Sequence, residues 1–207
     1  LGVFLLARRL RSAPFGFGFG FAGADRWSTL AVPAMVAALA ALAFTAASSS
    51  PGWLWSSEFS GFDALSYHLE LPKEWILGRR PVGPVEGNVY SALPSFAEAA
   101  FMQLMLIRGA LVEGAVACQF WSAFALLATA GVVARLARAV VGEGAGTYAL
   151  VAFLSLPWAI VVGTLAYNDM VPCLMFAGAW LLVARLAAAR SEEHTSELQS
   201  QFRISYA

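Results

Sequence analysis

Long apolar stretches separated by polar segments dominate the chain from residue 28 onward. An α-helix needs ~20 consecutive apolar residues to cross a bilayer whose hydrocarbon core is ~30 Å thick. Four stretches approach that length: residues 28–47, 111–134, 147–165 and 170–186. The pattern predicts an all-α, polytopic membrane protein with about four transmembrane helices.

A fifth apolar stretch, residues 94–107, is shorter and carries Glu98. Cytoplasmic flanks of membrane spans carry an excess of Lys and Arg. If this stretch does not span, all the basic clusters fall on one side; they are Arg8, Arg9, Arg11 and Arg26, then Arg135 and Arg138, then Arg185. We therefore predict an interfacial or re-entrant helix here. The outer loop 48–110 and the tetrapeptide 166–169 then face the same, non-cytoplasmic side.

Composition agrees with a membrane protein and excludes one class of partner. Hydrophobic residues make up 59% of the chain and charged residues only 13%, as in a chain that lies largely in lipid. No long run of Lys and Arg is present to neutralise phosphates, so no nucleic-acid partner is expected. Cys118 and Cys173 both fall inside apolar stretches, where packing as small hydrophobic side chains is favoured over a disulfide.

The outer loop 48–110 has the character of a segment that lies on the bilayer. Aromatic side chains settle at headgroup depth, and those near the start of the loop are Trp53, Trp55, Phe59, Phe62 and Trp75. On a helix, the residues that share one lipid-facing side are Leu65, Leu69, Pro72 and Ile76. Because Pro72 removes an amide donor and clashes with the preceding turn, we expect a break near Leu71 and a stop at Gly78.

A cluster of polar residues follows the first predicted span, and an amphipathic surface helix does not account for it. Asp63, Tyr67 and His68 stand together there, and Asp169, beside Asn168, occupies the matching place after the third span. The polar residues thus gather in the outer loops and not at mid-span. This arrangement marks the outer side of the membrane as the place of a candidate site.

The order of these elements resembles a known superfamily over residues 60–180. The matching elements are "GFDALSYHLELPKEWILGRRP" after the first span, "NVYSALPSFAEAAF" before the second, Pro157-Trp158 within the third, and "AYND" at its outer end. Together they are similar to the N-terminal part of the GT-C membrane glycosyltransferases, the superfamily of protein O-mannosyltransferases and aminoarabinose-type lipid A transferases (glycosyltransferase family 39-like).

The resemblance implies an enzyme that moves a sugar from a polyprenyl-phosphate donor to an acceptor of unknown identity. By the same resemblance, Asp63 is the catalytic base and Asp169 the second acidic position. The implied location is the inner (plasma) membrane of a bacterium, with the active-site loop facing outward. Many members of the superfamily have two adjacent acidic residues where this chain has Asp63-Ala64. No cofactor is therefore certain, and a divalent metal stays open.

The chemistry explains why these residue types would gather. A carboxylate that accepts the proton of an acceptor hydroxyl assists its attack on the anomeric carbon, and one displacement with one base inverts the configuration. The leaving phosphate gains negative charge, which cations stabilise, and Arg suits that contact better than Lys. The candidate substrate-binding residues are Tyr67, His68, Lys73, Arg79, Arg80 and Asn168.

Each assignment has a simpler alternative. Asp63 and Asp169 are residue types that cap helix N-termini, and Arg79 and Arg80 can anchor at headgroups. His68 can orient Asp63, bind phosphate, or pack as an interfacial histidine. The alternative for the whole chain is a non-enzymatic transporter or scaffold whose loop contacts lipid. Transporters are often built from inverted repeats, and the sequence contains no evident internal repeat.

The last residues, "RSEEHTSELQSQFRISYA", differ in composition from the rest. They match a translated short-read sequencing adapter from Arg190 to Ser200 and again from Ile204 to Ala207, with the sample index between. We therefore expect residues 190–207 to be non-native and exclude them from the fold. The expected organisation is a cytoplasmic segment 1–27, a truncated GT-C-like transmembrane domain 28–189, and this tail. Such a fragment is expected to be inactive alone.

Overall fold

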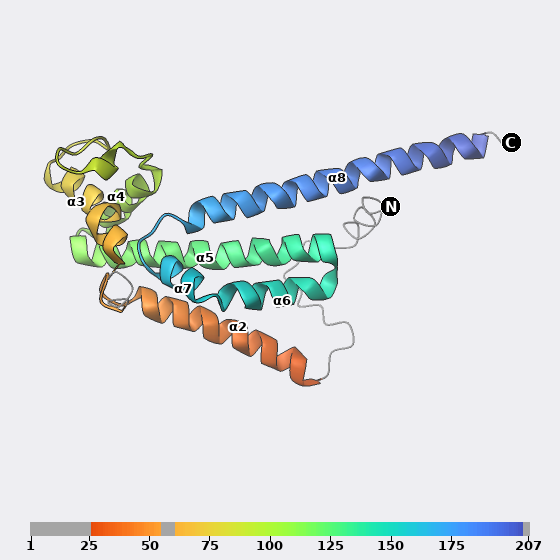
Figure 1. The fold of residues 1–207 in the computed structure, drawn as a ribbon, viewed down its shortest axis with the longest axis horizontal. Coiled ribbons are helices and arrows are strands. Elements are labelled where there is room, and N and C mark those ends of the chain that lie inside the picture. The colour runs from red at the N-terminus through yellow and green to blue at the C-terminus, as the bar shows by residue number, and fades with distance from the viewer. Residues whose placement is uncertain (1–25, 55–60, 205–207) are drawn as a thin grey trace. The chain divides into compact units, whose positions relative to one another are not determined.

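A computed structural model of the chain describes residues 26–54 and 61–204 (Figure 1). Side chains are described for residues 30–54 and 61–190. Within these ranges the elements are α2 (Arg26–Ala47), the π-helical turn η2 (Ala64–His68), α3 (Glu70–Leu77), the 3-10 helix η3 (Val89–Ala92), α4 (Phe96–Arg108), α5 (Leu111–Val141), α6 (Glu143–Leu154), α7 (Pro157–Thr164) and α8 (Met170–Ile204). The expected all-α fold is confirmed for the described part of the chain.

Three of the described helices are long and apolar enough to cross a membrane. The candidate spans are Leu30–Ala47, Leu111–Val141 and Met170–Arg190, with mean hydropathies of 2.1, 1.8 and 1.8. The stretch 147–165, predicted as the third span, is divided between α6 and α7. These two helices pass the same test only together, as a broken span or a re-entrant loop. The described chain therefore has three or four candidate spans.

The break between α6 and α7 has a local cause in Pro157. A residue that precedes proline is disfavoured in helical conformation, and Leu156 has the extended angles φ −68° and ψ 118°. Pro157 then stands at the start of α7, where its missing N–H is not needed. The third predicted span can therefore cross the membrane only as a bent pair of helices.

The chain divides into two compact units, and all the candidate site residues belong to one of them. That unit comprises residues 36–129 and 154–174, with the outer loop, α7, the start of α8 and the adjoining parts of α2 and α5. The loop 48–110 and the tetrapeptide 166–169 are therefore parts of one unit.

Polar side chains of α5 hold the ends of the other helices in this unit. Gln119 Nε2 donates to the carbonyls of Ala47 (2.8 Å) and Ser49 (2.7 Å), at the end of α2. The hydroxyl of Ser122 donates to Tyr167 O (3.1 Å). The hydroxyl of Thr129 lies 2.7 Å from Ala125 O of α5 itself and 3.2 Å from Met170 O. A backbone carbonyl that water does not reach needs a hydrogen-bond donor from the protein. The turn between α7 and α8 is therefore fixed against α5.

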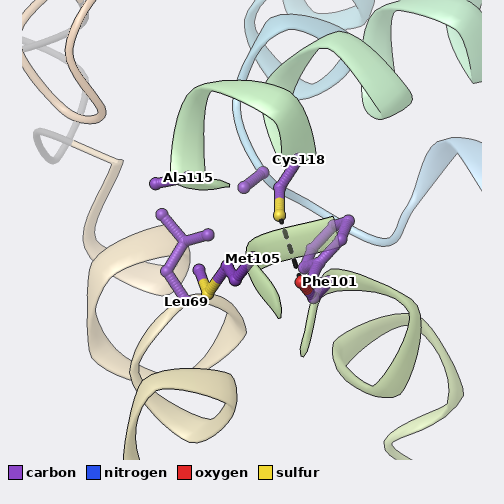
Figure 2. Packing of buried hydrophobic residues seen from close by; sticks show 6 residues of the cluster. Leu69, Phe101, Met105, Ala115 and Cys118 are labelled. Carbon is purple, nitrogen blue, oxygen red and sulfur yellow. Dashed lines mark hydrogen bonds between the residues drawn. The ribbon is translucent and has the colours of Figure 1, made fainter. Parts of the chain in front are cut away.

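A buried apolar cluster joins the outer loop to the same helix. It consists of Leu69, Phe101, Met105, Ala115, Cys118 and Ala166, which come from the end of η2, from α4, from α5 and from the turn after α7. Figure 2 shows the Cys118 sulfur directed at the carbonyl of Phe101, and the thiol donates to it at 3.7 Å. Cys118 thus packs as a buried free thiol, as expected.

The outer-loop helix is interrupted, although the break lies at Leu69 and not near Leu71. Leu69 N–H donates to Ala64 O (2.9 Å), which makes a π-helical turn. The extra residue shifts the register, so Pro72 falls in the first turn of α3, where its missing N–H is tolerated. α3 ends at Leu77, and Gly78 follows as its C-cap, as expected.

The side of this helix predicted to face lipid faces protein over much of its length. Leu69 and Pro72 are buried, whereas Leu65 is exposed. Trp75, expected at headgroup depth, is only 1% exposed, and its indole N–H donates to Gly83 O (2.9 Å). The π-helical turn adds one residue to the helix and so changes which of its side chains are buried. Periodicity alone does not predict this change.

The remaining expectations concern the other aromatic residues of the outer loop and the two ends of the chain. Trp53 and Phe62 are exposed, while Trp55 and Phe59 lie outside the described residues, as does most of the predicted N-terminal segment 1–27. α8 continues as a helix through Arg190 to Ile204. A helical backbone does not bear on the predicted non-native origin of residues 190–207.

We expect Gly114→Ala to destabilise the packing of α4 on α5. A Cβ at this position would meet Met105 Cα at 2.7 Å, so backbone would have to move, and overpacking of this kind costs about 1–3 kcal/mol. Gly178→Ala on α8 is the matched control, because its Cβ would meet nothing within 4 Å. Thermal unfolding in detergent measures both; an equally stable Gly114→Ala would contradict the tight contact.

Candidate functional site

A pocket of about 380 Å³ brings together the two aspartates that the sequence singled out. Its lining residues are Phe62, Asp63, Trp158, Val161, Val162, Tyr167 and Asp169. Asp63 comes from the start of the outer-loop helix, and Asp169 comes from the turn before α8. The lining is therefore aromatic and apolar, with two carboxylates as its acidic groups.

Asp63 does not act as a helix cap. It has helical angles (φ −64°, ψ −40°), and its side chain makes no capping hydrogen bond to the π-helical turn that follows. Its side chain is half-buried and lines the pocket. The capping alternative therefore fails for Asp63. Asp169 is exposed, and its backbone carbonyl accepts from Cys173 N–H (3.3 Å) in the first turn of α8.

Two tyrosines stand against these carboxylates and feel their charge. Burial, followed by the negative charges of Asp63, Asp169 and Glu98, raises the pKa of Tyr67 to about 12. Burial and the same two aspartates raise the pKa of Tyr167, and hydrogen bonding to the backbone of Asp63 and Ala64 partly offsets that rise. Both phenols stay protonated at neutral pH and can serve as hydrogen-bond donors.

A buried ionisable pair lies next to the tyrosines. His68 Nδ1 is 2.5 Å from Glu98 Oε1, and the two residues are 1% and 3% exposed. So short a distance requires a proton between the two atoms, as in a charge-assisted hydrogen bond. Removing one partner from a buried pair costs about 3–5 kcal/mol. The pair therefore joins η2 firmly to α4.

The imidazole ring of His68 packs against tyrosine rings and does not line the pocket. Its ring centroid lies 4.1 Å from that of Tyr67 and 5.6 Å from that of Tyr167, at 90°. Tyr67 is also stacked on Tyr90, with centroids 4.5 Å apart. The hydrogen-bond partner of His68 is Glu98, and not Asp63 or a phosphate as expected.

The three predicted phosphate-binding cations are not brought to the pocket. Lys73 Nζ pairs with Glu70 (2.6 Å), and Arg80 pairs with Glu74 (3.5 Å), both on the partly exposed surface of α3. Arg79 is exposed, with a positive φ of 48°. Neither Lys nor Arg occurs in the lining described for the pocket.

Asn168 stands beside Asp169, half-buried, and its carbonyl accepts from Val171 N–H (3.0 Å). For a divalent metal, the pocket offers only two carboxylates. Among the described residues there is no group of three or more His, Cys, Asp or Glu side chains that could hold a metal ion. Within residues 26–54 and 61–204, the ligands available to a metal at this pocket are the carboxylates of Asp63 and Asp169.

Sequence reasoning missed three residues of this site. Glu98 was set aside, although an ionisable side chain in an apolar stretch is often functional. Tyr167 stood within the quoted "AYND", and Trp158 within Pro157-Trp158, but neither was given a role. A signal for Glu98 was its charge within an apolar stretch, and a signal for Tyr167 was its place at the outer end of the third stretch, whereas Trp158 lies within that stretch.

Comparison with known proteins adds no relative, because no family model matches the chain and no curated protein or solved structure is similar to it. The arguments for function therefore come from the residues of the site.

We expect the Tyr67 phenol to ionise with a midpoint at about pH 12, compared with the ordinary 10.0. Folding then depends on pH, because the folded chain keeps this proton where the unfolded chain loses it. The contribution of Tyr67 to stability is present below pH 10 and is lost as the pH rises towards 12.

Ultraviolet titration of wild type against Tyr67→Phe isolates this ionisation. Asp63→Asn should lower its midpoint, because a carboxylate that disfavours the phenolate is gone. Glu86→Gln, at an exposed carboxylate of the same loop, is the control. A midpoint that Asp63→Asn leaves unchanged would contradict the proximity of Asp63 to Tyr67.

Proposed function

We propose that the protein is a membrane glycosyltransferase of the GT-C type. It transfers a sugar from a polyprenyl-phosphate donor to an acceptor hydroxyl on the extracytoplasmic side, with inversion. The observation that carries the proposal is the pocket that Asp63 and Asp169 line together with Trp158 and Tyr167. The resemblance of the sequence to that superfamily agrees with it.

In this proposal Asp63 is the general base. Its carboxylate lines the pocket and is not used as a helix cap, so it is available to accept the proton of an acceptor hydroxyl. Attack on the anomeric carbon then passes through an oxocarbenium-like transition state. The negative charge of Asp169 stabilises the positive charge that develops on the sugar ring. A single displacement inverts the anomeric centre.

The aromatic lining fits the sugar part of such a donor. Trp158 and Phe62 present exposed aromatic side chains, which can cover the apolar C–H face of a sugar ring. Tyr167 can donate a hydrogen bond to a sugar hydroxyl. Because two carboxylates repel an anion, the pocket takes the sugar, and the donor phosphate binds beyond the lining.

The donor phosphate and the lipid need the membrane surface. Three or four candidate spans make this an integral membrane protein, and in the proposal α4 lies at the interface or is re-entrant. Arg79 and Arg80 follow α3 and are exposed, so they remain candidates for contact with the phosphate or with headgroups.

The test is glycosyl transfer from a panel of polyprenyl-phosphate sugars, assayed in membranes with the full-length gene product. We expect Asp63→Asn to lower transfer by about 10²–10⁴-fold, since it removes the general base while preserving shape. Glu86→Gln, an exposed carboxylate outside the pocket, should transfer like wild type.

The possible outcomes separate the role of Asp63 from the function itself. Equal transfer by Asp63→Asn and wild type would remove Asp63 as the base. No transfer by wild type with any donor would contradict the glycosyltransferase and favour the transporter or scaffold. Thermal unfolding of each variant excludes misfolding as the cause of a loss.

A further inference from the structure

The His68–Glu98 pair lies directly behind the pocket, although neither residue lines it. The His68 ring meets the ring of Tyr167 edge to face, with centroids 5.6 Å apart. Tyr167 in turn lines the pocket. His68 therefore contacts a residue that lines the pocket of Asp63 and Asp169.

Tyr167 connects the two segments that carry the aspartates. Its side chain packs against the cluster that contains Ala64, the residue after Asp63. Tyr167 stands two residues before Asp169, and its backbone carbonyl accepts a hydrogen bond from the hydroxyl of Ser122 (3.1 Å). A displacement of the Tyr167 ring would therefore change the spacing of the two carboxylates.

The carboxylate of Glu98 makes one described hydrogen bond, to His68. Its second oxygen, Oε2, is buried and has no hydrogen-bond partner among the residues that the structure describes. The described hydrogen bonding of the carboxylate thus consists of the contact with His68 Nδ1. An ionised acceptor strengthens that contact about twofold over a neutral one, which restrains the orientation of the imidazole ring.

We infer that Glu98 and His68 are positioning residues of the site. Glu98 fixes the imidazole ring of His68, and that ring braces Tyr167 so that Asp63 and Asp169 keep the spacing the reaction needs. The inference rests on the proposed function for its kinetic readout. The position of the Tyr167 ring is a second readout that needs no activity.

A purely structural role is the competing explanation. The pair joins η2 to α4 across 30 residues of sequence, and a join of this kind could support folding without affecting the pocket. Glu98→Gln separates the two explanations, because the amide keeps the shape and one acceptor oxygen but loses the charge. Glu113→Gln, at an exposed carboxylate in the first turn of α5, is the matched control.

The experiment measures kcat and KM of the full-length protein in membranes, together with NMR spectra of ¹⁵N-histidine and ¹³C-tyrosine. The spectra are recorded on the 207-residue chain, which has two histidines, so His194→Gln leaves the His68 signal alone, and Tyr167→Phe assigns the Tyr167 ring. In Glu98→Gln we expect the low-field Nδ1 proton to move upfield and the Tyr167 signals to shift. A misplaced site should lower kcat by about 10²-fold, while KM stays within about twofold.

Unchanged Tyr167 signals and unchanged kcat in folded Glu98→Gln would overturn the inference. If wild type transfers no sugar, the proposed function fails, and the Tyr167 signals alone decide: a shift in Glu98→Gln but not in Glu113→Gln supports the brace.

If Glu98→Gln does not fold, the double variant His68→Met/Glu98→Met takes its place. Apolar replacement of both members of a buried pair is generally tolerated, and it removes the ring. Loss of the His68 ring current alone shifts the Tyr167 signals in this variant, so kcat is the readout: a fall of about 10²-fold in the folded double variant supports the inference, and an unchanged kcat overturns it.

Discussion

Backbone carbonyls at the ends of helices need hydrogen-bond donors when no water reaches them. In this protein α5 supplies those donors from inside an apolar segment: Gln119 at the end of α2, and Ser122 at the turn between α7 and α8. That turn carries Asp169. The place of one of the two aspartates is thus a consequence of satisfying backbone polar groups, and the pocket depends on it.

Much of the fold follows from hydropathy and proline chemistry. Apolar length predicted the helices that become α2, α5 and α8, and Pro72 predicted an interruption in the outer loop. Where the prediction failed, a local backbone constraint outweighed the average pattern. Pro157 breaks the third predicted span, and the π-helical turn before Leu69 changes which side chains are buried. Neither effect is visible in a window of hydrophobicity.

The candidate site was predictable only in part. Asp63 and Asp169 stood out as acidic residues of the predicted outer side, one in the loop after the first span and one at the outer end of the third, and the structure brings both to one pocket. The partner of His68 was not predictable, since Glu98 is 30 residues away and packing alone brings the two together. Lys73 was chosen for closeness in sequence, yet it pairs on the surface of α3. Sequence distance is a poor guide to such contacts.

The central claim is that the segments of Asp63 and Asp169 meet at one pocket in the membrane-embedded protein. Cross-linking of Asp63→Cys with Asp169→Cys by a short bifunctional thiol reagent tests it, in a chain whose own Cys118 and Cys173 are replaced by Ala. The account predicts a cross-link in native membranes, and none when Glu86→Cys replaces the first partner. Absence of a cross-link between two cysteines that both react with a monofunctional reagent would contradict it.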